Sequence, residues 1–395
     1  MSRGRSLLPT LSILSLAVTF GVVAVTPAFG SAWPRAHRVR NWEPEFMAND
    51  HSYSRAEALA HAREFDVIVA ISGSFREHVG AMRQANPRLR ILAYQNGGYS
   101  STGRSYPEAW YAHTATGARI RSRDHGNYLM QIANPNYVRH VISECRDHLD
   151  ASRYDGCFLD SMGPAAMSTS YVTGVAIDPR TGSAWGLGDY IRAGRHLVGE
   201  VGRATGRRLV VANGVASGSA YFASPGTGIL ADPIDGAMVE LFVRTASDSP
   251  GTYRPTSRWR LDVDMLRHAA RNDRTLFCVT KAWSDASRAR EDRMFRYAFA
   301  TFLLGASSRS YFSFLYDRNT GRPSSAWDVG LGRPRGAYGR HDGVFQRRFA
   351  HGRALVNPSD RGVRVRLPHR MRTLGGRWVR RVWMPDHTGL VLLRR

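Results

Sequence analysis

Short apolar runs alternate with longer amphipathic stretches along most of this chain. Several of the short runs are apolar without interruption, as strands covered on both faces require. Eight runs have the length and composition of β-strands: Arg38–Trp42, Asp66–Ser72, Arg90–Gln95, Gly156–Asp160, Arg208–Asn213, Gly236–Glu240, Thr275–Lys281 and Ser310–Phe314. The stretches with helical character are Arg55–Glu64, Arg76–Ala85, Asn136–Leu149, Asp189–Ala204, Arg258–Arg271 and Arg288–Leu304.

This alternation predicts parallel strands joined by right-handed crossovers. Eight such strands predict an α/β fold, a closed (β/α)8 TIM barrel, which we assign to residues 31–335. An open doubly wound sheet is the alternative. It would need a glycine-rich phosphate loop at the start of a helix, and Gly97–Gly98 lacks the further glycines of such a loop.

Two connections of the predicted barrel are long, from Gly97 to Asn134 and from Met162 to Leu187. Insertions of this kind build the active site at the carboxyl face of a barrel. The first one is rich in rings that either stack on sugar faces or fill a small core of the insertion itself. These residues are Tyr99, Tyr106, Trp110, Tyr111, His125 and Tyr128.

The sequence pattern changes after about Pro334, where short alternating stretches are separated by turn residues. The stretches are Arg353–Val356, Val363–Leu367, Trp378–Trp383 and Gly389–Leu393. Such a pattern is typical of antiparallel strands. We predict a small C-terminal β-domain over residues 340–395 that packs on the barrel.

The first 30 residues resemble a targeting segment. Arg3 and Arg5 precede an uncharged apolar stretch from Leu7 to Val25, and Ala28-Phe29-Gly30 has the small residues of a cleavage site. An uncleaved membrane anchor is the alternative, because 19 apolar residues are long enough to span a bilayer. We predict a cleaved signal peptide over residues 1–30 and a secreted or cell-envelope protein.

The chain carries a formal net charge of +23, yet Lys281 is its only lysine among 55 basic residues. This arginine bias indicates a codon preference more than a ligand, and no nucleic-acid signature accompanies it. A basic surface for anionic cell-wall polymers or phospholipids stays open. The three cysteines, Cys145, Cys157 and Cys278, do not form the framework of a disulfide-rich protein, and whether Cys145 pairs with Cys157 is open. No spacing of Cys or His predicts a metal site, and no cofactor is expected.

Two predicted strands end in an acidic residue. Asp160 closes the run YDGCFLD, and Glu240 follows the run DGAMV. Because the carboxyl ends of barrel strands share one face, these strands, the fourth and sixth, place two carboxylates at one barrel mouth. Paired carboxylates are the groups that cleave a glycosidic bond, one ionised and one holding a proton. Each acid alone would also suit a salt bridge to an arginine, but the matched pair favours catalysis.

Further candidates for substrate binding follow other strands. Lys281 ends the seventh strand and stands where arginine is otherwise used throughout, which favours a contact with substrate or with a catalytic carboxylate. Chance survival of one lysine is the alternative. The remaining candidates are side chains for sugar contacts, each of which also has a plain structural explanation as a turn or core residue: Trp283, Asn213, Asn96, Tyr99 and Trp42. Glu43 is a third acid to consider. No G-x-S-x-G or H-E-x-x-H motif supports serine hydrolase or metalloprotease chemistry.

The chain resembles a group named hypothetical glycosyl hydrolase family 15. The resemblance rests on NPNYVRHVI (Asn134–Ile142), YDGCFLD (Tyr154–Asp160), GAMVELF (Gly236–Phe242) and FQRRFAHGRALVNPSD (Phe345–Asp360). The tail also looks like the β-domain that follows the barrel in amylase-like enzymes. The acids on strands four and six are similar in layout to those of retaining α-galactosidases and α-glucosidases. That similarity implies that Asp160 is the nucleophile and Glu240 the acid/base.

The sequence thus predicts an exported glycoside hydrolase that retains anomeric configuration and acts on an extracellular or cell-envelope polysaccharide. It predicts no nucleic-acid partner and no membrane contact after signal cleavage. The first rival is a catalytically inactive carbohydrate-binding barrel of the cell envelope. The second is an arginine-rich protein that binds anionic envelope polymers without turnover.

Overall fold

The computed structural model describes residues 39–48, 52–206, 208–223, 234–245, 248–249, 251–282, 287–316 and 328–394. The predicted signal peptide and Trp283 lie outside these residues. In the described part of the chain, no helix is both long enough and apolar enough to cross a membrane.

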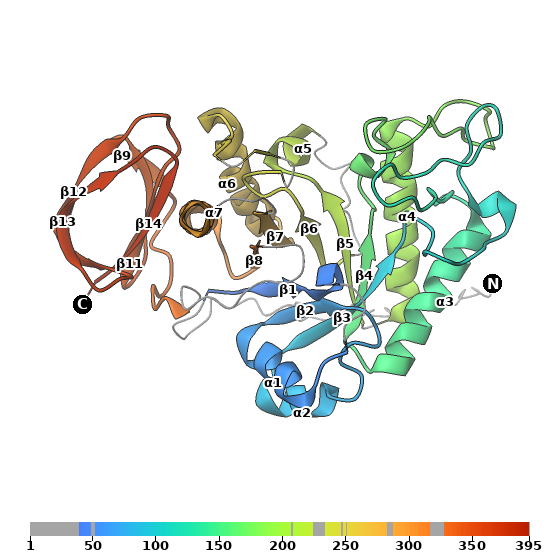
Figure 1. The fold of residues 1–395 in the computed structure, drawn as a ribbon, viewed down its shortest axis with the longest axis horizontal. Helices are drawn as coiled ribbons and strands as arrows, with labels where there is room; N and C mark the ends of the chain where they lie inside the picture. Colours follow the sequence, from blue (N-terminus) through green and yellow to red (C-terminus); the bar gives the residue numbers. More distant parts are fainter. Residues whose placement is uncertain are drawn as a thin grey trace, which may run out of the picture.

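Eight parallel strands form a nearly closed barrel in chain order (Figure 1). They are β1 (Trp42–Pro44), β2 (Val67–Ala70), β3 (Arg90–Asn96), β4 (Gly156–Asp160), β5 (Leu209–Val215), β6 (Gly236–Val239), β7 (Thr275–Lys281) and β8 (Ser310–Leu315). The first and last strands meet through a parallel bridge between Asn41 and Phe312, whose N–H donates to the carbonyl of Arg40 at 3.1 Å. The predicted α/β barrel is therefore confirmed.

Helices follow the strands and cover the outside of the barrel (Figure 1). They are α1 (Arg55–Glu64), α2 (Val79–Ala85), α3 (Pro135–Ser152), α4 (Leu187–Thr205), α5 (Gly218–Ala223), α6 (Thr256–Arg271) and α7 (Arg288–Gly305). Three short 3-10 helices are η1 (Glu45–Ala48), η2 (Glu108–Trp110) and η3 (Pro164–Met167). Local sequence sets several starts: Ser54 and Glu57 form a capping box on α1, and Asn134 caps α3 with Pro135 in its first turn.

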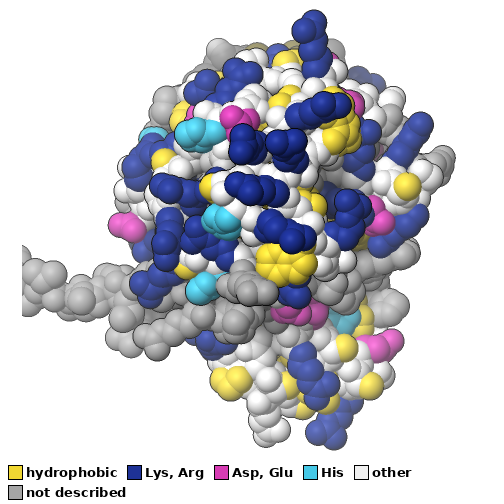
Figure 2. All heavy atoms as spheres, turned by 90° about the vertical axis from the view of Figure 1, so that its left-hand side faces the viewer, with side chains coloured by type: hydrophobic (Ala, Val, Ile, Leu, Met, Phe, Trp, Pro, Cys, Tyr) yellow, Lys and Arg dark blue, Asp and Glu magenta, His cyan; other side chains and the backbone are white. Residues whose placement is uncertain are grey.

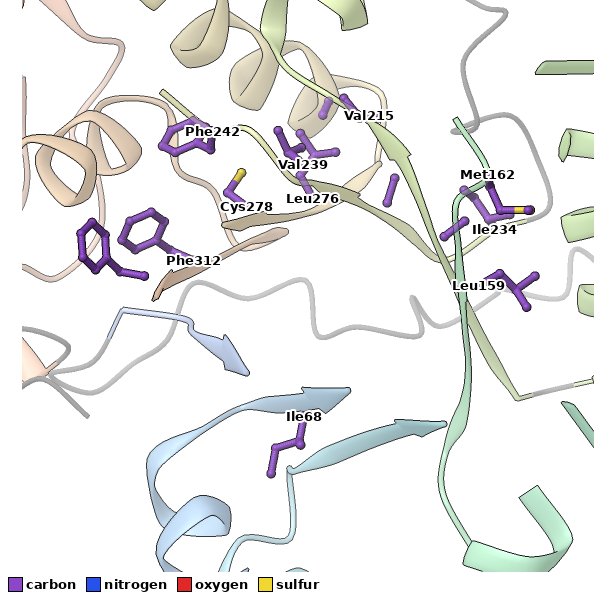
Figure 3. Packing of buried hydrophobic residues seen from close by; sticks show 14 of the residues in the cluster. Ile68, Leu159, Met162, Val215, Ile234, Val239, Phe242, Leu276, Cys278 and Phe312 are labelled. Carbon is purple, nitrogen blue, oxygen red and sulfur yellow. The ribbon is translucent and has the colours of Figure 1, made fainter. Parts of the chain in front are cut away.

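Side chains of the barrel strands alternate between two separate apolar clusters. Phe158 of β4 and Met238 of β6 belong to the cluster inside the barrel. Leu159 and Val239, the next residues along each strand, belong to the cluster between strands and helices, where Figure 3 shows them pointing away from the barrel interior. Because the strand period is two, Asp160 and Glu240 share the inward parity of Phe158 and Met238.

A disulfide joins Cys145 of α3 to Cys157 of β4, which answers the question that the sequence leaves open. Cys157 faces outward from the barrel, so the bond ties a strand to the helix that covers it. Cys278 is a buried free thiol.

The C-terminal part is a second sheet, of six antiparallel strands, that curves into a half-barrel (Figure 1). Its strands are β9 (Gly339–His341), β10 (Val344–Arg348), β11 (Gly352–Asn357), β12 (Val363–Thr373), β13 (Trp378–Met384) and β14 (Thr388–Leu393), in the spatial order β13-β12-β14-β11-β10-β9.

This sheet packs against α6 and α7 of the barrel. Phe345 lies 4.9 Å from Trp259 of α6, centroid to centroid, and Phe349 is buried in the same large cluster as the barrel helices. Gly389 of β14 approaches α7 so closely that a Cβ would lie 2.2 Å from the carbonyl oxygen of Arg296. Leu355, which the sequence suggested as a barrel contact, instead belongs to the core of the β-domain itself.

Candidate active site

Four adjacent strands present polar side chains at the carboxyl end of the barrel. Asp160 ends β4, Asn213 lies near the end of β5, Glu240 follows β6 and Lys281 ends β7. These strands are neighbours in the order β4-β5-β6-β7 and all run in the same direction. Their carboxyl ends therefore bring the four side chains to one edge of the barrel.

The side-chain amide of Asn213 holds the two carboxylates together. Its Nδ2 donates to Asp160 Oδ1 at 2.8 Å and to Glu240 Oε2 at 2.9 Å. These two oxygens are therefore at most 5.7 Å apart, the length of both bonds laid end to end. Retaining glycosidases keep their carboxyl groups about 5–5.5 Å apart and inverting ones about 6.5–9.5 Å apart.

Three donors fix Asp160. Besides Asn213, the hydroxyl of Tyr94 donates to Oδ2 at 3.0 Å and the N–H of Ser161 donates to Oδ1 at 2.7 Å. Ser161 has a φ of 63°, in the left-handed region that residues other than glycine seldom adopt. Such strain persists where the surroundings enforce it, most often at functional sites.

Lys281 pairs with Glu240. Its Nζ lies 2.5 Å from Glu240 Oε1, and its side chain is only 5% exposed, whereas that of Glu240 is 37% exposed. The lysine stem is thus packed inside the barrel while the carboxylate reaches toward solvent. The lone lysine of the chain therefore contacts a candidate catalytic acid, as its position at a strand end suggests.

The two carboxylates differ in charge. Burial and the nearby charge of Glu240 raise the pKa of Asp160, although its hydrogen bonds with Asn213, Tyr94 and Ser161 act in the opposite direction. Burial also acts to raise the pKa of Glu240, but the charge and hydrogen bond of Lys281 outweigh it, so the pKa of Glu240 is lowered. In the free protein, Glu240 is the acid that ionises first.

Both long connections reach this site, and they also pair with each other. Ser122 of the first forms a bridge with Val172 of the second, and the N–H of Arg123 donates to the carbonyl of Tyr171 at 2.9 Å. The positive charge of His125 contributes to the low pKa of Glu240, and the charges of both carboxylates help to raise the pKa of Tyr171, although burial is the larger cause. His125 and Tyr171 lie side by side, with ring centroids 6.3 Å apart.

The other candidates for sugar contacts have structural partners. Asn96 Oδ1 accepts from the N–H groups of Gly98 and Tyr99 at 3.1 and 2.9 Å, so it shapes the turn after β3. Tyr99 is 2% exposed, and its hydroxyl donates to the carbonyl of Ala166 at 2.5 Å, so it lies within the core of the insertion. Trp42 is fully buried inside the barrel.

A second acidic group lies at the end of β1 but is already paired. Glu43 is 1% exposed and its Oε2 lies 2.5 Å from His61 Nδ1. Glu45, the next acid, is buried as well, and burial raises its pKa to about 7. Within the described ranges, no three His, Cys, Asp or Glu side chains are grouped so that they could hold a metal ion.

Two of the residues that surround the acids were not singled out by the sequence. Tyr94 shares strand parity with Asn96 and lies two residues before it, so the alternation along β3 was a usable signal. No local pattern predicted the left-handed backbone of Ser161.

Comparison with solved structures finds distant likenesses. The glycoside hydrolase domain of PelA from Pseudomonas aeruginosa is 15% identical, matching 67% of this chain and 93% of that domain with a TM-score of 0.43. An α-amylase from Geobacillus thermoleovorans, complexed with acarbose, is 10% identical and covers 92% of this chain and 100% of its own, with a TM-score of 0.49. The maltogenic α-amylase AmyB from Thermotoga neapolitana is 11% identical over 91% of this chain and 99% of its own, with a TM-score of 0.49.

Comparison with curated proteins finds no match. The sequence model of hypothetical glycosyl hydrolase family 15, in contrast, matches residues 83–353. This segment contains the strands that carry Asp160, Asn213, Glu240 and Lys281. Because the match extends over more than half of the chain, the chain belongs to hypothetical glycosyl hydrolase family 15 and is a glycoside hydrolase.

Proposed function

We propose that this chain is an exported enzyme that cleaves O-glycosidic bonds of an extracellular or cell-envelope polysaccharide with retention of anomeric configuration. The observation that carries the proposal is the single amide of Asn213, which holds Asp160 and Glu240 at the spacing of a retaining pair. Membership of a glycosyl hydrolase family supports the same reaction class.

In the proposed reaction, Asp160 attacks the anomeric carbon while the glycosidic C–O bond breaks. The leaving oxygen takes the proton of Glu240. Water then attacks the glycosyl-enzyme, giving its proton to Glu240 and releasing Asp160. The rigid setting of Asp160 among three donors suits a nucleophile, and the more exposed Glu240 suits a group that reaches the leaving oxygen and the water.

The reverse order is the second candidate, and Lys281 favours it. Because Lys281 keeps Glu240 ionised in the free protein, Glu240 could attack while Asp160, whose pKa is raised, donates the proton. In the first order, substrate binding must shift the proton to Glu240. Both orders predict retention, and the Lys281 variants described below tell them apart.

Export is supported by the disulfide between Cys145 and Cys157 and by the leader-like first 30 residues. Disulfides persist in oxidising compartments and are rare in the cytosol of mesophiles.

Digestion of a polysaccharide array by the full chain, with analysis of the released sugars, tests the proposal. We expect one class of polymer to release oligosaccharides in the wild type and none to do so in the Asp160→Asn variant. The inactive carbohydrate-binding alternative predicts that a polymer is retained by wild type and variant alike, with no product from either.

Changing Lys281 should move one limb of the pH profile. Lys281→Met removes the charge that lowers the pKa of Glu240, so this pKa rises. If Glu240 must be protonated, activity persists to higher pH and the alkaline limb of kcat/KM moves up. If Glu240 must be ionised, activity is lost sooner on acidification and the acidic limb moves up.

Lys281→Arg is the matched control, because it keeps the charge but not the shape of the donor. We expect lower activity with both limbs in place and little change in Tm. Unmoved limbs in Lys281→Met would show that the ion pair does not govern either catalytic group.

A further inference from the structure

The outer face of the β12–β13 hairpin carries the densest positive charge of the chain. Between residues 361 and 381, eight residues are arginine and none is acidic. The eight are Arg361, Arg364, Arg366, Arg370, Arg372, Arg377, Arg380 and Arg381, and all are exposed. Figure 2 faces the C-terminal domain and shows dark blue side chains gathered over it, with few acids between them.

The strand register places these arginines beside one another without neutralisation. Arg366 lies directly opposite Arg381 on the exposed face. Like charges directly across two strands repel each other and destabilise the sheet. Within the described residues, none of the eight guanidinium groups forms an ion pair with an acid of the chain. A bound polyanion would relieve this repulsion.

Two exposed tryptophans lie on the same face. Trp383, opposite Arg364, is 60% exposed, and Trp378, opposite Arg372, is 41% exposed. The five residue steps between them along β13 correspond to roughly 15–17 Å. This spacing suits an extended polymer that lies along the hairpin better than it suits a small ion.

Trp383 is held in place by a glycine. A Cβ built on Gly362 would lie 2.1 Å from Cζ2 of the Trp383 ring, so the ring lies directly over the bare backbone of the neighbouring strand. Packing of one ring face on the sheet fixes the indole and leaves the other face for a ligand. Such preorganisation lowers the entropic cost of binding.

We infer that this face binds an anionic polysaccharide, whose acidic groups pair with the arginines and whose sugar rings stack on Trp378 and Trp383. Guanidinium groups match carboxylate and phosphate in geometry, and indole faces attract the C–H faces of sugar rings. A glycan is favoured over nucleic acid because the same chain is a glycoside hydrolase. A membrane is disfavoured because the two tryptophans are separated by arginines and form no continuous apolar face. The inference rests on the proposed function, since it names the class of polymer that the barrel would receive.

Binding of the full chain to defined polymers tests the inference. The probes are polygalacturonate for carboxylates, wall teichoic acid for phosphates, dextran as a neutral glycan, single-stranded DNA, and vesicles with phosphatidylglycerol, each at 50 and 200 mM NaCl. Asp160→Asn is present in all proteins, so that binding is read without turnover. We expect salt-sensitive binding to at least one anionic glycan and none to dextran.

Three variants locate the binding to the hairpin. Arg366→Gln with Arg381→Gln, and separately Trp383→Ala, should each weaken the affinity by about tenfold, the loss of one interface anchor. Gly362→Val should do the same by displacing the ring. Arg55→Gln with Arg88→Gln removes the same charge from exposed positions of the barrel and should change affinity less than about twofold.

Equal affinity in the hairpin variants, or equal loss in the barrel control, would overturn the inference. Tighter binding to DNA or to vesicles than to both anionic glycans would show that the partner class is wrong. Wild-type protein that binds the glycan through the hairpin but cleaves no polymer would contradict the proposed function and leave this surface standing.

Discussion

Replacement of Asp160 by Asn should abolish turnover of every substrate, lowering kcat/KM by at least about 10³-fold. Asn has the same shape but cannot attack the anomeric carbon as a carboxylate or pass a proton. Glu240→Gln should cause a loss of about 10²–10⁴-fold on polysaccharide. In the first order of roles, it should largely spare the first step on aryl glycosides with good leaving groups, which need little protonation.

Thermal unfolding provides the control for both variants. The two substitutions keep side-chain volume, and removing one of two adjacent carboxylates relieves repulsion, so Tm should stay near that of wild type or rise. Asn213→Ala is the companion variant, because it separates the carboxylates without changing either. Full activity of Asp160→Asn would contradict the site assignment, whatever its stability.

Removal of the residues after Pro334 should make the barrel insoluble. Trp259 and the outer side of α7 would lose Phe345, Phe349 and β14 and would expose a broad apolar surface. The end of α7 would also lose Arg347, whose Nη1 donates to the carbonyls of Leu303 and Ala306 at 3.1 and 2.6 Å.

Solubility and circular dichroism of the truncated chain measure this effect. Arg347→Gln in the full chain isolates the contribution of the helix-end contact, and it should be soluble with a lower Tm. A soluble, cooperatively folded truncation would show that the β-domain is an independent module and that the predicted division near residue 335 is also a folding boundary.

Strand prediction was best where apolar runs are bounded by turn residues. Gly156–Asp160 and Thr275–Lys281 have the predicted bounds, because each run is buried on both faces and no other element competes for it. The first strand was placed too early. Trp42, Glu43 and Pro44 form the ladder with β2, although Glu and Pro are poor strand formers, so pairing with the neighbour overrides local preference.

That shift explains the position of Trp42. The sequence places it at the end of a strand, where it would face the barrel mouth. In the structure it begins the strand, and its indole donates to the carbonyl of Cys278 at 2.9 Å inside the barrel. The six-residue helix α5 was missed because it is short and begins at a glycine.

The candidate site was predictable as a set of strand ends but not as a set of contacts. Strand counting brought Asp160, Asn213, Glu240 and Lys281 to one end of the barrel. The hydrogen bonds of Asn213 to both acids depend on the relative heights of three strands, which no local pattern encodes. The disulfide is similar, because Cys145 and Cys157 become neighbours only when α3 folds back over β4.

The anomer released in the first moments of hydrolysis tests the central claim most directly. Proton NMR of a reaction on the best polymer from the array, recorded before mutarotation, reports the configuration at the new reducing end. Two carboxylates bridged by the amide of Asn213 predict the same configuration as in the substrate bond. Initial release of the opposite anomer would contradict the double displacement by Asp160 and Glu240.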